Sequence, residues 1–174
     1  MLQVMRVELE EQVWILDEIG EVEWFMLFQL PESADFTRSM KGRRRILPEV
    51  VDDEEVAADW REYVQPELET RFQDEIQLVA SDLRKAEELG KIGRNGNLYR
   101  LKVPVEHAET WYSVLNQARL ILNEDHEIAR TERGLMAGDE LPTAIDEQKW
   151  LIMVQYRIYG AIQEFLLTYL MGDY

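Results

Sequence analysis

The two histidines, His107 and His126, are the residues of this chain best suited to catalysis or metal binding. A di-iron helix bundle needs Glu-x-x-His pairs whose ligands share one helix face. Pro104 and Asn123 stand three residues before the two histidines, so the chain cannot build such a site. Asn123, His126 and Glu127 could still contact one cation, but a histidine at a helix end more often packs or caps. We therefore predict no metal site.

Nucleophilic catalysis has no recognisable motif either. The chain has no cysteine, which excludes a thiolate nucleophile, a thiolate metal site and a disulfide framework. No serine lies in a GxSxG elbow, and the HExxH motif is absent. We predict no catalytic residues and no cofactor. A polar site assembled across helices would escape this search, so an enzyme stays open as an alternative.

The chain is strongly acidic, with 35 acidic and 19 basic residues and a formal net charge of −16. Such a charge repels phosphate backbones, which argues against a nucleic-acid partner. The last helix is too interrupted by polar residues to span a membrane, so we expect no membrane partner. The first residues have no basic segment followed by an apolar run, as a signal peptide would. We expect a cytoplasmic protein.

Arg119 is a charged residue in the middle of the apolar face of a helix predicted over residues 104–129. A charge in that position is costly unless it is paired. The last helix offers Gln155 on its apolar face and Glu164 on its polar strip. We predict that Arg119 contacts one of them, with Glu164 preferred because guanidinium and carboxylate groups match in bidentate geometry. The alternative is that its stem bends out to solvent.

A run of basic residues without an acid among them forms a second candidate site. Its members are Arg38, Lys41, Arg43, Arg44 and Arg45. In an acidic protein this segment could dock an anionic partner, a phosphate or the chain's own acidic surface. The alternative is an exposed loop that nearby carboxylates balance. The segment is therefore a candidate partner-binding loop.

Acidic residues at helical spacing near the start of the chain form a third candidate. Asp17 and Glu21 are four residues apart and could hold a hard cation, although a solvated face is the preferred interpretation. Trp14, Trp24 and Phe28 lie on or near this acidic side. They are either covered by another segment, which we favour, or they face a partner.

The helices that position these residues are predicted from apolar residues at helical spacing. The last helix, over residues 144–171, has so wide an apolar arc that other helices must cover it. Further helices are predicted over residues 10–30, 54–63, 66–89 and 104–129. We therefore predict a single, mainly α domain over residues 1–174, with about five helices packed around the C-terminal helix.

A small antiparallel sheet of two or three strands is also predicted. A period of two indicates a strand over residues 3–8, and the pair Asn95-Gly96 predicts a hairpin within residues 91–103. Each of these strands precedes an amphipathic helix, so the two strands are expected to pair. Residues 31–53 and 130–143, which glycine and proline interrupt, are predicted to be surface loops.

Three segments of the chain resemble a bacterial family of unknown function, number two thousand and seventeen in its series. They are RVELEEQ, PVEHAETWYSVLNQARLIL and YGAIQEFLLTYL. The resemblance covers most of the chain and includes the polar positions Asn116, Arg119, Gln163 and Glu164, whereas the basic segment 38–45 departs from the family's pattern. Its actinobacterial members are often encoded beside the Clp protease adaptor, which implies a link to regulated proteolysis but no activity.

We interpret the chain as a non-catalytic regulatory or scaffold protein that acts through contacts with an unidentified protein partner. Five Trp and seven Tyr are also consistent with a homodimer. The alternative is a small-ligand binder or enzyme with a pocket between helices near Arg119, His126 and Gln155. A large exposed aromatic patch would favour the first interpretation. A deep pocket with convergent polar groups would favour the second.

Overall fold

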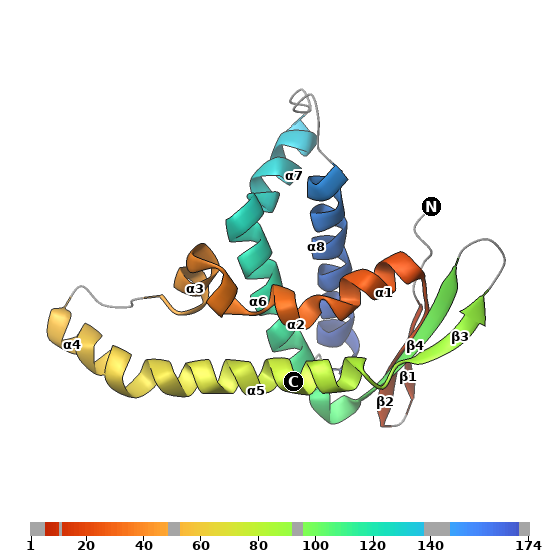
Figure 1. The fold of residues 1–174 in the computed structure, drawn as a ribbon, viewed down its shortest axis with the longest axis horizontal. Coiled ribbons are helices and arrows are strands. Elements are labelled where there is room, and N and C mark those ends of the chain that lie inside the picture. Colours follow the sequence, from red (N-terminus) through yellow and green to blue (C-terminus); the bar gives the residue numbers. More distant parts are fainter. Residues whose placement is uncertain (1–5, 11, 49–52, 92–95, 138–146, 171–174) are drawn as a thin grey trace.

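A computed structural model describes residues 6–10, 12–48, 53–91, 96–137 and 147–170. These residues form a mainly helical fold with one antiparallel sheet, which confirms the predicted fold class (Figure 1). The sheet has four strands rather than two or three. None of the described helices is both long and apolar enough to cross a membrane.

A hairpin replaces the first half of the helix predicted over residues 10–30. Its strands are β1 (Arg6–Glu10) and β2 (Val13–Ile19), and helix α1 (Glu21–Phe28), which lies within the predicted range, starts after Gly20. The first half of the prediction was wrong because a short apolar run fits a buried strand as well as a helix. β2 lies between β1 and β4, and four consecutive side chains from Trp14 to Asp17 are buried, so both faces of the sheet are covered at this point.

The strand order is β1-β2-β4-β3, with β3 at Glu87–Lys91 and β4 at Asn97–Pro104. The hairpin predicted around residues 91–103 is confirmed, but its register pairs Lys91 with Asn97, so the connection is longer than two residues. Asn95 lies outside the described residues, and Gly96 has a φ of +80°, which favours glycine. β2 rather than β1 pairs with β4, which leaves β1 at the sheet edge.

The loop predicted over residues 31–53 is wrong for most of its described part. That part holds the end of α2 (Leu30–Ser33), the 3₁₀ turn η1 (Phe36–Arg38) and α3 (Met40–Ile46). The side chain of Ser39 accepts a hydrogen bond from the backbone N–H of Gly42 and caps α3. Gly42 also lets α3 approach α6, since a Cβ there would lie 2.8 Å from Ile121. Such short helices depend on caps and tertiary packing rather than on a long apolar period.

A long helical rod follows, composed of α4 (Glu54–Asp59), the π-helical segment η2 (Trp60–Val64) and α5 (Gln65–Leu83). Asp53 caps α4, because its side chain accepts from the backbone N–H groups of Glu55 and Val56. The π-helical segment has a physical cause in Pro66, which lacks an N–H and would clash with the carbonyl four residues earlier in a regular α-helix. α5 ends before residue 89, the predicted end of this helix, because residues 87–91 form β3.

The C-terminal part contains η3 (Val105–His107), α6 (Ala108–His126), α7 (Ile128–Ala137), α8 (Glu147–Phe165) and η4 (Leu166–Leu170). α7 occupies much of the region predicted as a loop over residues 130–143, whose remaining residues lie outside the described part.

The central helix is α6 rather than α8. α2, α3, α5 and α8 all pack on α6. At the centre of the core, Trp14 of β2 meets Trp111 of α6 edge to face, with ring centroids 5.2 Å apart. The prediction that helices surround the C-terminal helix therefore has the wrong centre, since α6 carries one wide buried face that runs from Ala108 to Leu122.

Candidate functional site

A groove of about 600 Å³ lies between α1 and α8. Its lining is mostly apolar and comprises Glu21, Val22, Phe25, Met26, Gln29, Gln148, Leu151, Ile152 and Gln155. Three of the apolar side chains are open to solvent, with exposed fractions of 50% for Val22, 62% for Phe25 and 39% for Leu151. Contiguous exposed apolar surface of this kind marks interaction sites in soluble proteins.

The two walls of the groove are connected, because one buried tyrosine of α8 forms a hydrogen bond with α1. The hydroxyl of Tyr159, which is fully buried, donates to the backbone oxygen of Met26 at 2.8 Å. Gln155 Nε2 donates to the same hydroxyl at 2.7 Å and to Ser33 Oγ at 3.1 Å. Burial raises the pKa of Tyr159 above its ordinary value, so the hydroxyl keeps its proton and its donor role. The exposed side chains therefore sit on a fixed scaffold.

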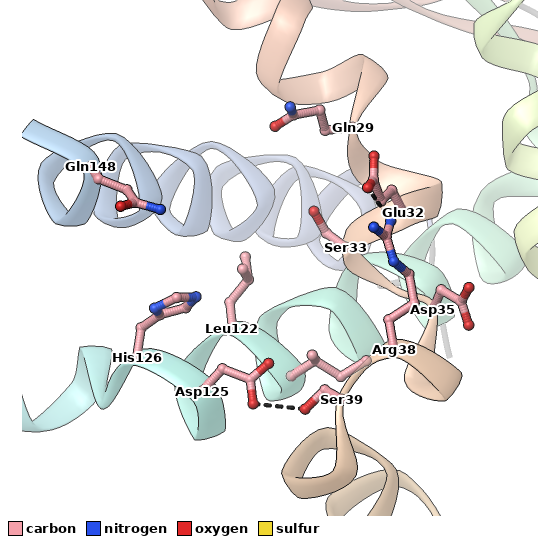
Figure 2. A pocket seen from close by; sticks show the side chains of 11 residues that line it. Gln29, Glu32, Ser33, Asp35, Arg38, Ser39, Leu122, Asp125, His126 and Gln148 are labelled. Atoms are coloured by element: carbon pink, nitrogen blue, oxygen red, sulfur yellow. Dashed lines mark hydrogen bonds and ion pairs between the residues drawn. The ribbon is translucent and has the colours of Figure 1, made fainter.

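A polar cavity of about 500 Å³ adjoins this groove and shares Gln29 and Gln148 with it. Figure 2 shows His126 and Gln148 on one side of the cavity and the ion pair of Arg38 with Glu32 on the other.

At the base of the polar cavity, the hydroxyl of Ser39 donates to Asp125 Oδ1 at 2.7 Å (Figure 2). A third cavity, of about 340 Å³, shares Asp125, His126 and Gln148. Polar groups from α2, η1, α6 and α8, together with the α3 N-cap Ser39, thus converge around a second hollow, the arrangement that can hold a small polar ligand.

The predicted partners of Arg119 are wrong. Its Nη1 donates to Gln163 Oε1 at 2.6 Å, and its guanidinium carbon lies 4.4 Å from the ring centroid of Tyr156. Glu164 is exposed, and Gln155 bonds to Ser33 and Tyr159 instead. Helical phase explains the error, because Gln163 rather than its neighbour turns toward α6. Among the described residues, the buried Nε of Arg119 has no hydrogen-bond partner.

The ligand pocket predicted near Arg119, His126 and Gln155 is therefore divided. His126 lines the polar cavity, and Gln155 lies at the base of the apolar groove. Arg119 stacks on Tyr156 and contributes to neither lining.

The basic residues of the second candidate site are largely balanced by the chain's own carboxylates. Arg38 pairs with Glu32, Arg43 pairs with Glu69, and Arg45 lies 3.9 Å from Glu124. The remaining two members are Lys41 and Arg44, both exposed on α3. The interpretation that nearby carboxylates balance these charges holds for the three paired arginines, while a partner-binding role for the segment stays a prediction.

In the third candidate site, that of Asp17 and Glu21, the carboxylate of Asp17 pairs with an arginine of the same sheet. Asp17 in β2 accepts two hydrogen bonds from Arg100 in β4, from Nε at 2.9 Å and from Nη2 at 2.7 Å. These hydrogen bonds hold the pKa of the Asp17 carboxyl below its ordinary value. In the part of the chain that the structure describes, no group of three His, Asp or Glu side chains could hold a metal ion.

The aromatic residues near this site are mostly covered within the chain, as favoured from the sequence. Trp14 is fully buried, and Trp24 stacks on Tyr99 with ring centroids 5.0 Å apart. Phe28 is the exception, with an exposed fraction of 54%.

Asp82 is an important polar residue that the sequence reasoning missed. Its carboxylate is fully buried between α5 and α6. It accepts from Trp111 Nε1 at 3.1 Å, pairs with His107 Nδ1 at 2.7 Å and lies 2.8 Å from Lys85 Nζ. Burial raises the pKa of Asp82, but the hydrogen bonds from Lys85, Trp111 and His107 outweigh it and leave the pKa below its ordinary value.

The pair of Asp82 with His107 could orient an imidazole for proton transfer, but the described residues place no hydroxyl nucleophile in hydrogen-bond contact with this histidine. The sequence signal that could have identified Asp82 is its position three residues after Val79, which places an acid on the apolar face of α5. Because the carboxylate has donors from several elements, we assign the cluster to the stability of the α5–α6 interface.

Comparison with known proteins adds a family but no activity. No curated protein and no solved structure matches the chain. The sequence model of a family described as a domain of unknown function, DUF2017, matches residues 16–170. That range contains both walls of the groove, the polar cavity and the contact of Arg119 with Gln163. The chain belongs to the DUF2017 family.

Proposed function

We propose that this protein is a non-catalytic regulatory or scaffold protein that binds a partner protein in the groove between α1 and α8. The observation that carries the proposal is the exposure of Val22, Phe25 and Leu151 around one apolar groove. Large side chains that project from a rigid base are the usual anchors of a protein interface, because little conformational entropy is lost when they are buried. The buried hydroxyl of Tyr159 supports that base.

The family resemblance extends this proposal to regulated proteolysis. Since related proteins are encoded beside the Clp protease adaptor, that adaptor is the first partner to test. The groove itself supports only the broader proposal, because its apolar lining would suit many protein segments.

A small-ligand binder is the second candidate function. The polar cavity favours it, because the side chains of Ser33, Ser39, Asp125 and His126 converge on one hollow. A ligand there would be small and polar, with groups that exchange hydrogen bonds with hydroxyl, carboxylate and imidazole side chains. Thermal stabilisation by a metabolite, lost in Asp125→Ala, would support this candidate over the first.

Affinity capture with matched variants tests the first proposal. Wild-type protein, Phe25→Glu and Leu9→Glu are immobilised, and retained proteins are identified by mass spectrometry. Leu9 is a suitable control because it lies on β1 and has an exposed fraction of 51%. A partner should bind wild type and Leu9→Glu and be lost with Phe25→Glu. If wild type and Phe25→Glu retain the same proteins, the groove is not the binding site.

A further inference from the structure

A second surface lies at the opposite end of the molecule, on residues 54–64 of α4 and η2, which we name the arm. Figure 1 shows α4 and η2 continuing the rod of α5 beyond the rest of the fold. α4 packs chiefly on η2, its own continuation along the chain. The arm therefore presents side chains to solvent that a helix inside the fold would bury.

The arm carries an apolar stripe that is largely exposed. Apolar residues occur at positions i, i+4, i+7 and i+8, namely Val56, Trp60, Tyr63 and Val64. This spacing places side chains on one side of a helix. The exposed fractions are 48% for Val56, 67% for Tyr63 and 37% for Val64. Three of these residues lie in the π-helical segment, and such segments occur frequently at functional sites.

The charges beside this stripe are almost all negative. Residues 53–64 contain one base, Arg61, and five acids, which are Asp53, Glu54, Glu55, Asp59 and Glu62. Arg61 is already paired with Glu54, with Nη2 and Oε1 2.7 Å apart. The arm thus combines an exposed apolar stripe with uncompensated negative charge.

From this combination we infer that the arm binds a basic amphipathic helix of a partner protein. Apolar residues of that helix would cover the stripe, and its Lys and Arg side chains would meet the carboxylates of the arm. Nucleic acids and anionic membranes are disfavoured because they carry the same sign of charge. A second copy of the arm is disfavoured for the same reason, since two acidic helices would repel each other along their length.

Binding of two synthetic peptides tests the inference. The first probe is a fluorescein-labelled basic amphipathic peptide, Lys-Leu-Ala-Lys-Leu-Ala-Lys repeated twice, and the second has Glu in place of every Lys. Fluorescence anisotropy is measured with wild type, with Val56→Ala/Tyr63→Ala and with Leu9→Ala/Phe28→Ala. The last variant is a matched control, because it removes an aliphatic and an aromatic residue with exposed fractions of 51% and 54% that lie outside the arm and outside the groove lining.

Wild type and the control variant should bind the basic peptide equally, whereas the arm variant should bind it about tenfold more weakly. Asp59→Asn/Glu62→Gln should also weaken binding, by about three- to tenfold. Circular dichroism should show equal helix content for all variants, since the substituted side chains are exposed.

Equal binding of the basic peptide by wild type and the arm variant would overturn the inference. So would equal binding of the acidic and basic peptides. A dimer detected by light scattering and lost in Val56→Ala/Tyr63→Ala would assign the arm to a second copy of the chain instead. These outcomes leave the groove proposal untouched, because it rests on residues of α1 and α8.

Discussion

The α5–α6 interface and the α1–α8 groove differ in how far they bury large side chains. Between α5 and α6, Trp111 and Asp82 are fully buried, and the carboxylate has three hydrogen-bonding partners. Between α1 and α8, Tyr159 is equally buried, yet Phe25 of the groove has an exposed fraction of 62%. The exposure of Phe25 is therefore a local property of the groove. On this difference rests our proposal that the first interface serves stability and the second serves binding.

Asp82→Ala should have the largest effect on stability. It leaves the indole N–H of Trp111 and the ring of His107 without their acceptor in a buried site. The free energy of unfolding should fall by about 2–4 kcal/mol. Urea denaturation followed by Trp fluorescence measures this change. Asp59→Ala, which removes an exposed carboxylate from α4, is the control and should change stability by no more than about 0.5 kcal/mol. Equal effects of the two substitutions would remove the distinction between interior and surface carboxylates.

Low pH should have the next largest effect, because it should weaken the α5–α6 interface. The pKa of Asp82 is lower in the folded protein than its ordinary value, so the folded state binds fewer protons than the unfolded state near that value. Its stabilising contribution is present above the ordinary pKa of about 3.9 and is lost as pH falls through the lower folded-state pKa. Asp17 acts with the same sign. The midpoint of thermal unfolding should therefore drop steeply below about pH 4, and less steeply in Asp82→Asn. An identical pH profile for that variant would contradict the role of Asp82.

Tyr159→Phe should have an intermediate effect. The substitution keeps the ring but removes the donor to the Met26 carbonyl and an acceptor for Gln155. The free energy of unfolding should fall by about 1–2 kcal/mol. Partner capture should weaken as well if the hydroxyl holds α1 in place. A stability loss without any change in capture would show that the groove tolerates movement of its base.

Arg119→Met should have the smallest effect. The guanidinium gains a hydrogen bond to Gln163 and a contact with Tyr156, but its buried Nε lacks a partner among the described residues. Replacing an imperfectly satisfied charge with an apolar side chain is often close to neutral, so we expect a change within about 1 kcal/mol. Chemical denaturation measures it. A loss above about 3 kcal/mol, the size expected when a buried pair is broken, would make Arg119 a stability determinant comparable with Asp82.

Long amphipathic helices were predictable from the sequence, because their apolar residues recur over many turns. This holds for α5, α6 and α8, whose predicted positions are confirmed apart from their ends. The hairpin of β1 and β2 was not predictable in the same way, since the apolar run from Val13 to Leu16 fits either structure and only its pairing with β4 decides. α3 depends on the contact of Gly42 with Ile121, which lies far away in the chain.

The candidate site was predictable in part. His126 lines the polar cavity and Gln155 lines the apolar groove, so the single pocket predicted near both residues is divided between two hollows. The partner of Arg119 was missed by one residue, since Gln163 faces α6 while Glu164, which points about 100° away around the helix, is exposed. The importance of Phe25 was missed because its exposure depends on the position of α1 against α8, which no local pattern contains.

Phe25→Glu, measured for stability and for partner binding in the same preparation, gives the most direct test. It asks whether the α1–α8 groove serves binding while the α5–α6 interface serves stability. We expect its free energy of unfolding to stay within about 0.5 kcal/mol of wild type, because the side chain is already exposed. Capture of the partner should be lost at the same time, while Leu9→Glu keeps it. A large loss of stability together with unchanged capture would contradict the assignment of the α1–α8 groove to binding.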